Sequence, residues 1–171
     1  MTEQIKIRAA TEEDAENMLA IQSGVLAEVD YLITTLEEFQ QTIDEQRKWI
    51  QAKLENEREL ILIAQYQEKI VGWLVFQSPN RKRLAHTGSF GMMILKEYRG
   101  LGIGKRLLEK LLKWAELNPY IEKISLGVFS TNESAIALYK KMGFVEEGRK
   151  INEIKLNDKQ YIDDVLMYKM V

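Results

Sequence analysis

The sequence Arg99-Gly100-Leu101-Gly102-Ile103-Gly104 stands at the junction between a predicted strand and a predicted helix. Residues 87–95 before it are typical of a strand, and the apolar positions after it recur at helical spacing as far as Leu117. Three alternating glycines let the backbone turn sharply and let a ligand approach the amides closely. Because the first amides of a helix lack internal partners and carry partial positive charge, this turn is predicted to bind an anion, most often a phosphate.

Two well-known phosphate-binding motifs do not fit this turn. A P-loop would need a glycine where the chain has Arg99 and a hydroxyl residue where it has Arg106. The dinucleotide-binding fingerprint would need a third glycine at Leu107, and it normally follows the first strand of its domain. The pattern that does fit is Arg-x-x-Gly-x-Gly, and Lys105 adds positive charge just inside the helix.

The N-terminal part of the chain predicts a strand followed by a helix. Residues 5–9 alternate between apolar and polar side chains, as a strand does. Thr11 and Asp14 have the spacing of a capping box, which predicts a helix that continues to about Gln22. Residues 23–34 have mixed character and are expected to form a loop.

A second helix and two strands are predicted next. Thr35 and Glu38 repeat the capping pattern, so the helix is expected to begin there. Its apolar stripe would consist of Phe39, Ile43, Ile50 and Leu54. Residues 60–64 are nearly all apolar, which predicts a strand that is buried on both faces. Residues 70–76 return as its neighbour.

The C-terminal part completes a mixed α/β pattern. It predicts a strand at 121–129, a helix at 132–142 and a final hairpin of strands at about 145–156 and 160–170. The order is therefore β-α-α-β-β-β-α-β-α-β-β. The unit of strand, helix and strand around the glycine turn should be parallel, so we expect a mixed sheet with helices on both faces.

Composition bounds the function classes. A chain of 171 residues without a linker predicts a single domain, residues 1–171. It has no cysteine and one histidine, His86, which excludes disulfides, thiolate zinc sites and multi-histidine metal sites. The net charge of −2 argues against nucleic acid as the main partner. We see no signal peptide or membrane segment, and expect a cytoplasmic protein without a metal.

Two segments of the chain resemble the GNAT superfamily of N-acetyltransferases. The sequence MMILKEYRGLGIG at residues 92–104 is similar to motif A of that family, and NESAIALYKKMGF at 132–144 is similar to its motif B. The predicted order of elements is also that of the family, so the resemblance spans nearly the whole chain. It implies a GNAT-like fold, that of the acyl-coenzyme A N-acyltransferases.

The resemblance implies acetyl-coenzyme A as the cosubstrate and assigns residues to it. The turn amides and flanking side chains would bind its pyrophosphate: Arg99, Gly100, Leu101, Gly102, Ile103, Gly104 and Lys105. The backbone of the preceding strand would pair with the pantetheine through Met92, Met93 and Ile94. Asn132 matches the asparagine of the family that contacts the cofactor.

The catalytic residues are implied in the same way. Tyr139 matches the tyrosine usually proposed to protonate the leaving thiolate. Many members carry a glutamate as general base on the strand before the turn, but this chain has Ser89 at that position. Serine is a poor base, so the proton would leave through water or through Glu28, Asp30 or Tyr31 in the predicted loop, and we favour Glu28.

The expected function is transfer of an acetyl group to a primary amine of a small molecule or of a protein N-terminus, by direct attack and without a covalent enzyme intermediate. The departure at Ser89 leaves one alternative, a coenzyme A-binding regulatory or interaction module without turnover. A nucleotide-binding protein that uses the glycine turn is another. We expect no membrane partner, and the final hairpin is a plausible place for homodimer pairing.

Purely structural roles stand beside some of these assignments. Tyr139 lies on an apolar stripe and would also suit the core, and Asn132 would also suit a helix cap. Asp163 and Asp164 are typical of sheet surface, although such a pair would also suit a cationic acceptor. His86 is expected at the surface or at a strand edge.

Overall fold

The computed structural model describes residues 4–28 and 31–171 and confirms the predicted order of the main elements. These are β1 (Ile5–Ala9), α1 (Ala15–Glu28), α2 (Ile43–Leu54), β2 (Leu60–Tyr66), β3 (Lys69–Gln77), β4 (Thr87–Ile94), α3 (Ile103–Leu117), β5 (Lys123–Phe129), α4 (Glu133–Lys141), β6 (Val145–Asn157) and β7 (Gln160–Met170). Short 3-10 helices lie at Glu12–Asp14, Lys82–Leu84 and Lys96–Tyr98.

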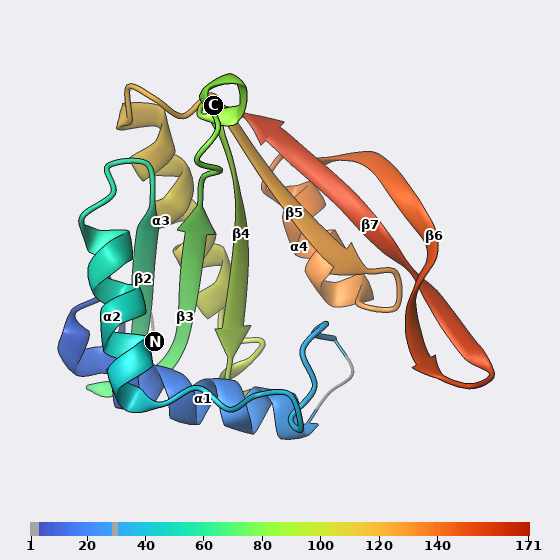
Figure 1. Ribbon diagram of the computed structural model, residues 1–171, viewed down its shortest axis with the longest axis horizontal. Helices are drawn as coiled ribbons and strands as arrows, with labels where there is room; N and C mark the ends of the chain where they lie inside the picture. The colour runs from blue at the N-terminus through green and yellow to red at the C-terminus, as the bar shows by residue number, and fades with distance from the viewer. Residues whose placement is uncertain (1–3, 29–30) are drawn as a thin grey trace.

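The strands form one seven-stranded sheet in the order β1-β2-β3-β4-β5-β7-β6. The first four strands are an antiparallel meander, and β4 and β5 are parallel because helix α3 connects them across the sheet. Strand β7 pairs antiparallel with β5, and β6 pairs antiparallel with β7, so the last two strands form a long hairpin at the edge (Figure 1). The mixed sheet predicted from the sequence is therefore confirmed.

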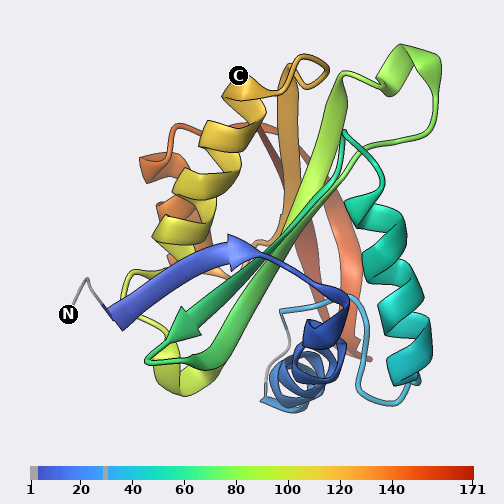
Figure 2. The ribbon, with the colours of Figure 1, turned by 90° about the vertical axis from the view of Figure 1, so that its left-hand side faces the viewer.

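Helices cover both faces of the sheet. Figure 2 shows α3 and α4 on one side and α1 and α2 on the other. Strand β2 supplies both cores: Leu62 and Ala64 pack with α3, whereas Ile61 and Ile63 pack with α1 and α2. All four are at most 2% exposed, so the prediction of a strand buried on both faces is confirmed. Burial of each large aliphatic side chain contributes about 1.5–3 kcal/mol to stability.

Helix α1 is longer than predicted. The expected end near Gln22 is wrong, because the helix continues through Gly24 to Glu28. Val25 and Leu26, in its last turns, are buried, and a Cβ at Gly24 would lie 3.6 Å from the Leu95 side chain. The glycine costs the helix about 1 kcal/mol relative to alanine, which is less than the gain from burying two aliphatic side chains.

Helix α2 starts later than predicted. The Thr35 amide donates to Glu38 at 2.8 Å, as a capping box does, but only a turn follows it. The helix begins at Ile43, after a second box in which the Thr42 amide donates to Glu45. Of the predicted apolar stripe only Ile50 is buried; Ile43 and Leu54 are exposed, and Phe39 precedes the helix. The face packed on the sheet instead contains Gln46, Trp49, Ile50 and Lys53.

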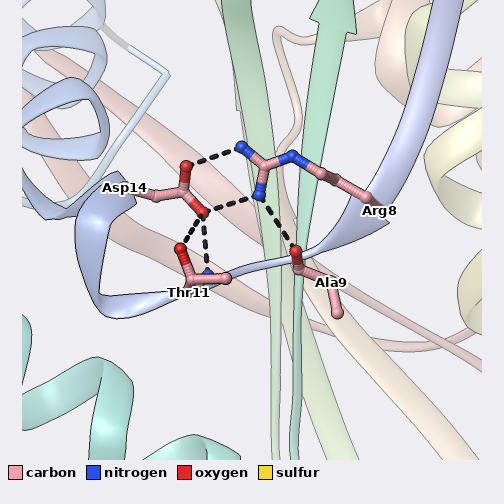
Figure 3. Close-up of polar contacts among 4 residues, drawn as sticks. All are labelled: Arg8, Ala9, Thr11 and Asp14. Carbon is pink, nitrogen blue, oxygen red and sulfur yellow. Dashed lines mark hydrogen bonds and ion pairs between the residues drawn. The ribbon is translucent and has the colours of Figure 1, made fainter.

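An ion pair fixes the angle at which the chain leaves β1 for α1 (Figure 3). Two guanidinium nitrogens of Arg8 donate to the two carboxylate oxygens of Asp14, each at 2.7 Å, and the Thr11 amide donates to the same carboxylate at 2.8 Å. Burial by itself would raise the pKa of Asp14. The hydrogen bonds from Arg8 and Thr11 outweigh burial and hold that pKa below its ordinary value.

The low pKa of Asp14 makes its contribution to stability depend on pH. Asp14→Asn should lower the free energy of unfolding by about 2 kcal/mol at neutral pH, because the bidentate pair is lost. A carboxyl group whose pKa is lowered by folding stabilises the protein above its unfolded pKa, and this contribution disappears as the pH falls through the folded pKa. The difference between wild type and variant should therefore shrink in acid.

Urea unfolding at a series of pH values measures this difference. Asp158→Asn is the control, because Asp158 also pairs with a cation but its side chain is 96% exposed, and it should change stability by less than about 0.5 kcal/mol. If Asp14→Asn lowers the free energy of unfolding by the same amount at every pH, the assigned role of the ion pair is contradicted.

Candidate active site

The site begins where the sheet opens. Strands β4 and β5 are paired along their first three residues, from Thr87 with Lys123 to Ser89 with Ser125. Beyond Ser89 the two strands diverge (Figure 1), while β4 stays paired with β3 as far as Ile94. One edge of β4 therefore has no partner strand in the described structure and is a template for another extended chain. The residues predicted to bind pantetheine lie on this segment: Met92, Met93 and Ile94.

A cleft of about 500 Å³ follows this edge toward the glycine turn. Its walls come from β4, the turn, the start of α3 and helix α4. All residues predicted to bind the cofactor line it except Leu101, whose side chain is exposed. The structure thus brings two segments that are 28 residues apart in the sequence into one concave surface.

The glycine turn has the geometry that an anion site needs. Gly100 and Gly102 have φ of +76° and +84°, values that side chains with a Cβ rarely adopt. A Cβ at either residue would meet nothing within 4 Å, so the space above the turn is open. Gly102 caps α3, and the amides at the start of that helix have no intrahelical acceptors. Gly104 instead allows α3 and α4 to pack closely, because a Cβ there would lie 3.3 Å from the Leu138 side chain of α4.

Arg99 holds the turn against two other elements. Its Nε donates to the carbonyl of Ile94 at 2.8 Å, and its guanidinium lies 3.6 Å from the carboxylate of Glu28. This pair connects the end of β4 to the last residue of α1. Glu28, the favoured general base in the sequence analysis, is thereby placed beside Arg99 and lines neither cavity of the site. Asp30 lies outside the described residues, and Tyr31 lines both cavities.

Tyr139 lies in the wall of the cleft and is 8% exposed. Its ring makes edge contacts with Phe90 of β4 and Phe144, at centroid distances of 5.7 and 6.2 Å. Burial raises the pKa of Tyr139 to about 12. The hydroxyl is therefore protonated at neutral pH, and within residues 4–28 and 31–171 it makes no hydrogen bond, so its proton is available to a ligand.

Asn132 is a helix cap and also lies at the cleft. It is the N-cap of α4, where its side-chain oxygen accepts a hydrogen bond from the Ala135 amide at 3.4 Å. It also lines the cleft, across from the glycine turn. His86 lies at the surface just before β4 and lines neither cavity.

A second cavity, of about 530 Å³, lies on the opposite face of the sheet. Alternation along β4 separates the two faces, so Ser89 lines the second cavity and Met92 lines the cleft. Four residues at the gap line both spaces: Tyr31, Leu32, Met93 and Gly127. The cleft and the second cavity therefore adjoin where β4 and β5 diverge.

The second cavity is apolar with an acidic end. Its walls include Leu26, Leu32, Phe129 and Leu166, and its ionisable carboxylates are Glu147 and Asp164. Glu147 is paired with Lys123. Asp164 is 8% exposed and makes no hydrogen bond or ion pair with any other described residue, and burial raises its pKa. No lysine or arginine is among the described residues that line this cavity.

The residues that line this cavity share no recognisable pattern in the sequence. Glu147 and Phe129 carried no local signal, and Ser89 was found only by its alignment to motif A. The one usable signal was the pair Asp163 and Asp164, because adjacent residues of a strand face opposite sides of a sheet. The structure separates them: Asp163 accepts a hydrogen bond from the Asn152 amide at 2.9 Å, whereas Asp164 faces the cavity.

The part of the chain that the structure describes has neither a metal site nor a membrane-spanning helix. No group of three or more histidine or acidic side chains there is arranged to hold a metal ion. No helix there has the length and apolar character needed to cross a membrane.

The arrangement is suited to group transfer between two ligands. The cleft offers amides and cations for phosphate, a free strand edge for an extended chain and one buried hydroxyl. The second cavity offers apolar walls and a carboxylate with no protein partner. No cysteine is available as a nucleophile, so a direct transfer between the two ligands is the chemistry that this arrangement favours.

Comparisons with known proteins agree with this geometry. The model of the Acetyltransferase (GNAT) family matches residues 26–144, which include β4, the glycine turn and α4. The chain is 26% identical over 165 residues to the SPbeta prophage-derived N-acetyltransferase YokL of Bacillus subtilis, and the match covers 95% of this chain and 88% of that protein.

Solved structures give the same result. A crystal structure of an acetyltransferase of the GNAT family from Streptococcus pneumoniae superposes with a TM-score of 0.94 and 29% identity, over 98% of this chain and 99% of that chain. The structure of yncA from Salmonella typhimurium, solved with its cofactor acetyl-CoA, superposes with a TM-score of 0.86 over 97% of this chain and 93% of that chain. Its identity is 17%, and the likeness shows a common fold.

Proposed function

The chain belongs to the GNAT family of acetyltransferases, and we propose that its cleft binds acetyl-coenzyme A while its second cavity binds the amine that receives the acetyl group. Transfer of an acetyl group from acetyl-coenzyme A to an amine is the activity that this membership carries. The observation that supports the division of the two substrates is the divergence of β4 and β5, which connects the two spaces.

The residues of the cleft fit coenzyme A. The amides of the turn at Gly100 and Gly102, with Lys105 beside them, would hold the pyrophosphate. The backbone groups at the free edge of β4 would exchange hydrogen bonds with the amides of pantetheine, which would then lie beside β4 like an added strand. Asn132 would contact the cofactor from α4. Leu101 shapes the turn from its exposed side and is assigned no contact with the cofactor.

Direct attack needs three contributions from the enzyme. The amine must be neutral, the carbonyl oxygen must be stabilised as charge develops on it, and the thiolate must be stabilised as it leaves. Backbone amides of β4 at the gap are suited to the second task. Tyr139 is suited to the third, because its hydroxyl is protonated, lines the cleft and has no hydrogen-bond partner among the described residues, so it can donate to the thiolate. A covalent enzyme intermediate is not required.

The acceptor is an amine of a small molecule or of a protein N-terminus, and the second cavity favours one subclass. A free amino acid carries a carboxylate beside its amine. The described lining residues include no lysine or arginine to bind that carboxylate, and Asp164 would repel it. We therefore propose an acceptor whose amine has no neighbouring carboxylate, such as a polyamine, an aminoglycoside-like amine or the N-terminus of a protein.

The cellular setting is proposed from composition and surface. The absence of cysteine suits a reducing compartment, so we propose the cytoplasm. Strand β6 is at the edge of the sheet and exposes Val145, Ile151 and, on its partner β7, Tyr161. These side chains make the final hairpin the proposed surface for a homodimer.

Release of free thiol from acetyl-coenzyme A across a panel of amines tests the proposed function. Polyamines, aminoglycosides and peptides with a free N-terminus should support turnover, and free amino acids should react at least about tenfold more slowly than their carboxyl amides, because a buried charge without a partner is costly. Cofactor binding without turnover on any amine would favour a coenzyme A-binding module. Tight binding of ATP without binding of coenzyme A would favour a nucleotide-binding protein.

Gly102→Ala tests the turn. A methyl group at φ of +84° is strained and would enter the open space above the amides, so coenzyme A should bind about tenfold more weakly, which corresponds to about 1.4 kcal/mol. Gly143→Ala is the matched control, because Gly143 has φ of +90° but lies outside the cleft. Isothermal titration with coenzyme A measures both. Equal affinity in the two variants would remove the turn from the binding site.

Tyr139→Phe tests the acid. The ring contacts with Phe90 and Phe144 remain, so the fold and the affinity for coenzyme A should not change, whereas kcat should fall about 100-fold. Tyr120→Phe is the control, because Tyr120 is 48% exposed and lies outside both cavities. A wild-type kcat for Tyr139→Phe would leave this tyrosine with a packing role alone.

A further inference from the structure

The carboxylate of Asp164 is the buried charge that the fold does not use. The residue lies on β7 and is 8% exposed, and its carboxylate, which opens to the second cavity, makes no hydrogen bond or ion pair with the other described side chains. A Cβ at Gly127 would lie 2.9 Å from its Oδ1, so the carboxylate stands directly over the glycine of β5 that borders both cavities. A carboxylate that has no hydrogen-bond partner in the protein and opens to a ligand cavity is placed to bind a cationic group of a ligand.

Asp163, the neighbouring residue, shows what a structural aspartate does in this strand. Its Oδ1 accepts a hydrogen bond from the Asn152 amide at 2.9 Å, and its Oδ2 lies 3.8 Å from Arg149. These contacts hold the irregular part of the hairpin between β6 and β7 together. Asp164 points to the other face of the sheet, where the apolar walls of the second cavity surround it.

We propose that Asp164 binds the ammonium group of the acceptor and removes its proton, so that it is the general base of the acetyl transfer. This inference rests on the proposed function. The strand position at which many members of the family carry a glutamate is Ser89 here, and Ser89 and Asp164 line the same cavity. The base is thereby supplied from β7 across the gap, in place of β4.

The proposed transfer begins with the protonated amine and ends with the amide, the free thiol and one released proton. The ammonium R–NH3⁺ transfers one proton to the Asp164 carboxylate and becomes a neutral amine. The nitrogen lone pair then forms a bond to the thioester carbonyl carbon, and the carbon–sulfur bond breaks with its electron pair going to sulfur. Tyr139 protonates the thiolate and recovers a proton from the new amide nitrogen by way of solvent. Asp164 releases its proton to water, so the net products are R–NH–acetyl, coenzyme A and H⁺.

The surroundings of Asp164 suit a base. Burial disfavours the charged form of both a carboxylate and an ammonium, which narrows the difference between their pKa values and eases the transfer of a proton. Lys150, opposite on β6, favours the ionised carboxylate, and Glu153 on the same strand opposes it. Among the described residues that line the cavity, the other ionisable groups are Glu147 and Tyr31, and β5 and α1 contribute none.

Steady-state kinetics of Asp164→Asn with the best amine of the panel tests this assignment. The value of kcat/KM for the amine should fall about 100-fold or more, while the affinity for coenzyme A stays within about twofold. Asp164→Glu, which retains a carboxylate, should recover part of the activity. Asp163→Asn is the matched control, because an asparagine still accepts the Asn152 hydrogen bond, and it should stay within about threefold of wild type.

Two further readouts separate a base from a structural residue. The pH profile of kcat/KM should have an acid limb, since a protonated Asp164 cannot accept a proton, and Asp164→Asn should lack that limb. The melting temperature of Asp164→Asn at neutral pH should equal or exceed that of wild type, because folding raises the pKa of Asp164 and so disfavours its ionised form. A lower melting temperature would indicate that Asp164 has a structural partner and would overturn the proposal.

The remaining outcomes are also decisive. If the wild-type enzyme acetylates an amine and Asp164→Asn does so at the same rate, the role of Asp164 is overturned and the proposed function stays intact. A rise in KM with unchanged kcat and an unchanged acid limb would reduce Asp164 to an ammonium-binding residue and overturn its role as base. A wild-type enzyme that releases no thiol with any amine would overturn the proposed function, and this inference with it.

Discussion

The divergence of β4 and β5 is the constraint on which the site depends. Parallel pairing holds the two strands together over three residues and then stops, although both strands continue. The opening exposes one edge of β4, places the glycine turn at its end and connects the two faces of the sheet. A fully paired sheet would separate the two cavities, and the same side chains would then have no common reaction point.

An opening in the middle of a sheet needs support from its surroundings. Backbone groups without partners are costly when buried, so the gap must face ligand or solvent. The cores on both faces of β2 hold the meander rigid on one side. Near the gap, the rings of Phe90, Tyr139 and Phe144 pack together, and Arg99 connects the end of β4 to Glu28 of α1. Packing around the opening therefore replaces the missing strand pairing.

Local patterns in the sequence were enough to predict the order of elements, the mixed sheet and the glycine turn. They did not predict where α1 ends, because the cost of Gly24 is local and the compensating burial of Val25 and Leu26 is tertiary. They predicted that α2 begins at Thr35, whereas it begins after Thr42, because both threonines form the same hydrogen bond and packing continues only the second turn into a helix. The second cavity could not be predicted from local patterns for a related reason. It depends on the pairing of β5 with β7, two strands that are far apart in the chain.

Charge explains why the two substrates need opposite faces of the sheet. Phosphate requires the positive amides and Lys105 at the turn, whereas an ammonium group requires a carboxylate. If Asp164 lay within the cleft, it would repel the phosphates and pair with the cations that should bind them. The sheet keeps these charges on separate faces, and Gly127, which lines both cavities, has no side chain that would displace the Asp164 carboxylate beside it. The small net charge of −2 therefore does not reveal two different local environments, and in the proposed mechanism their separation is what allows a chain without cysteine to use one carboxylate and one hydroxyl.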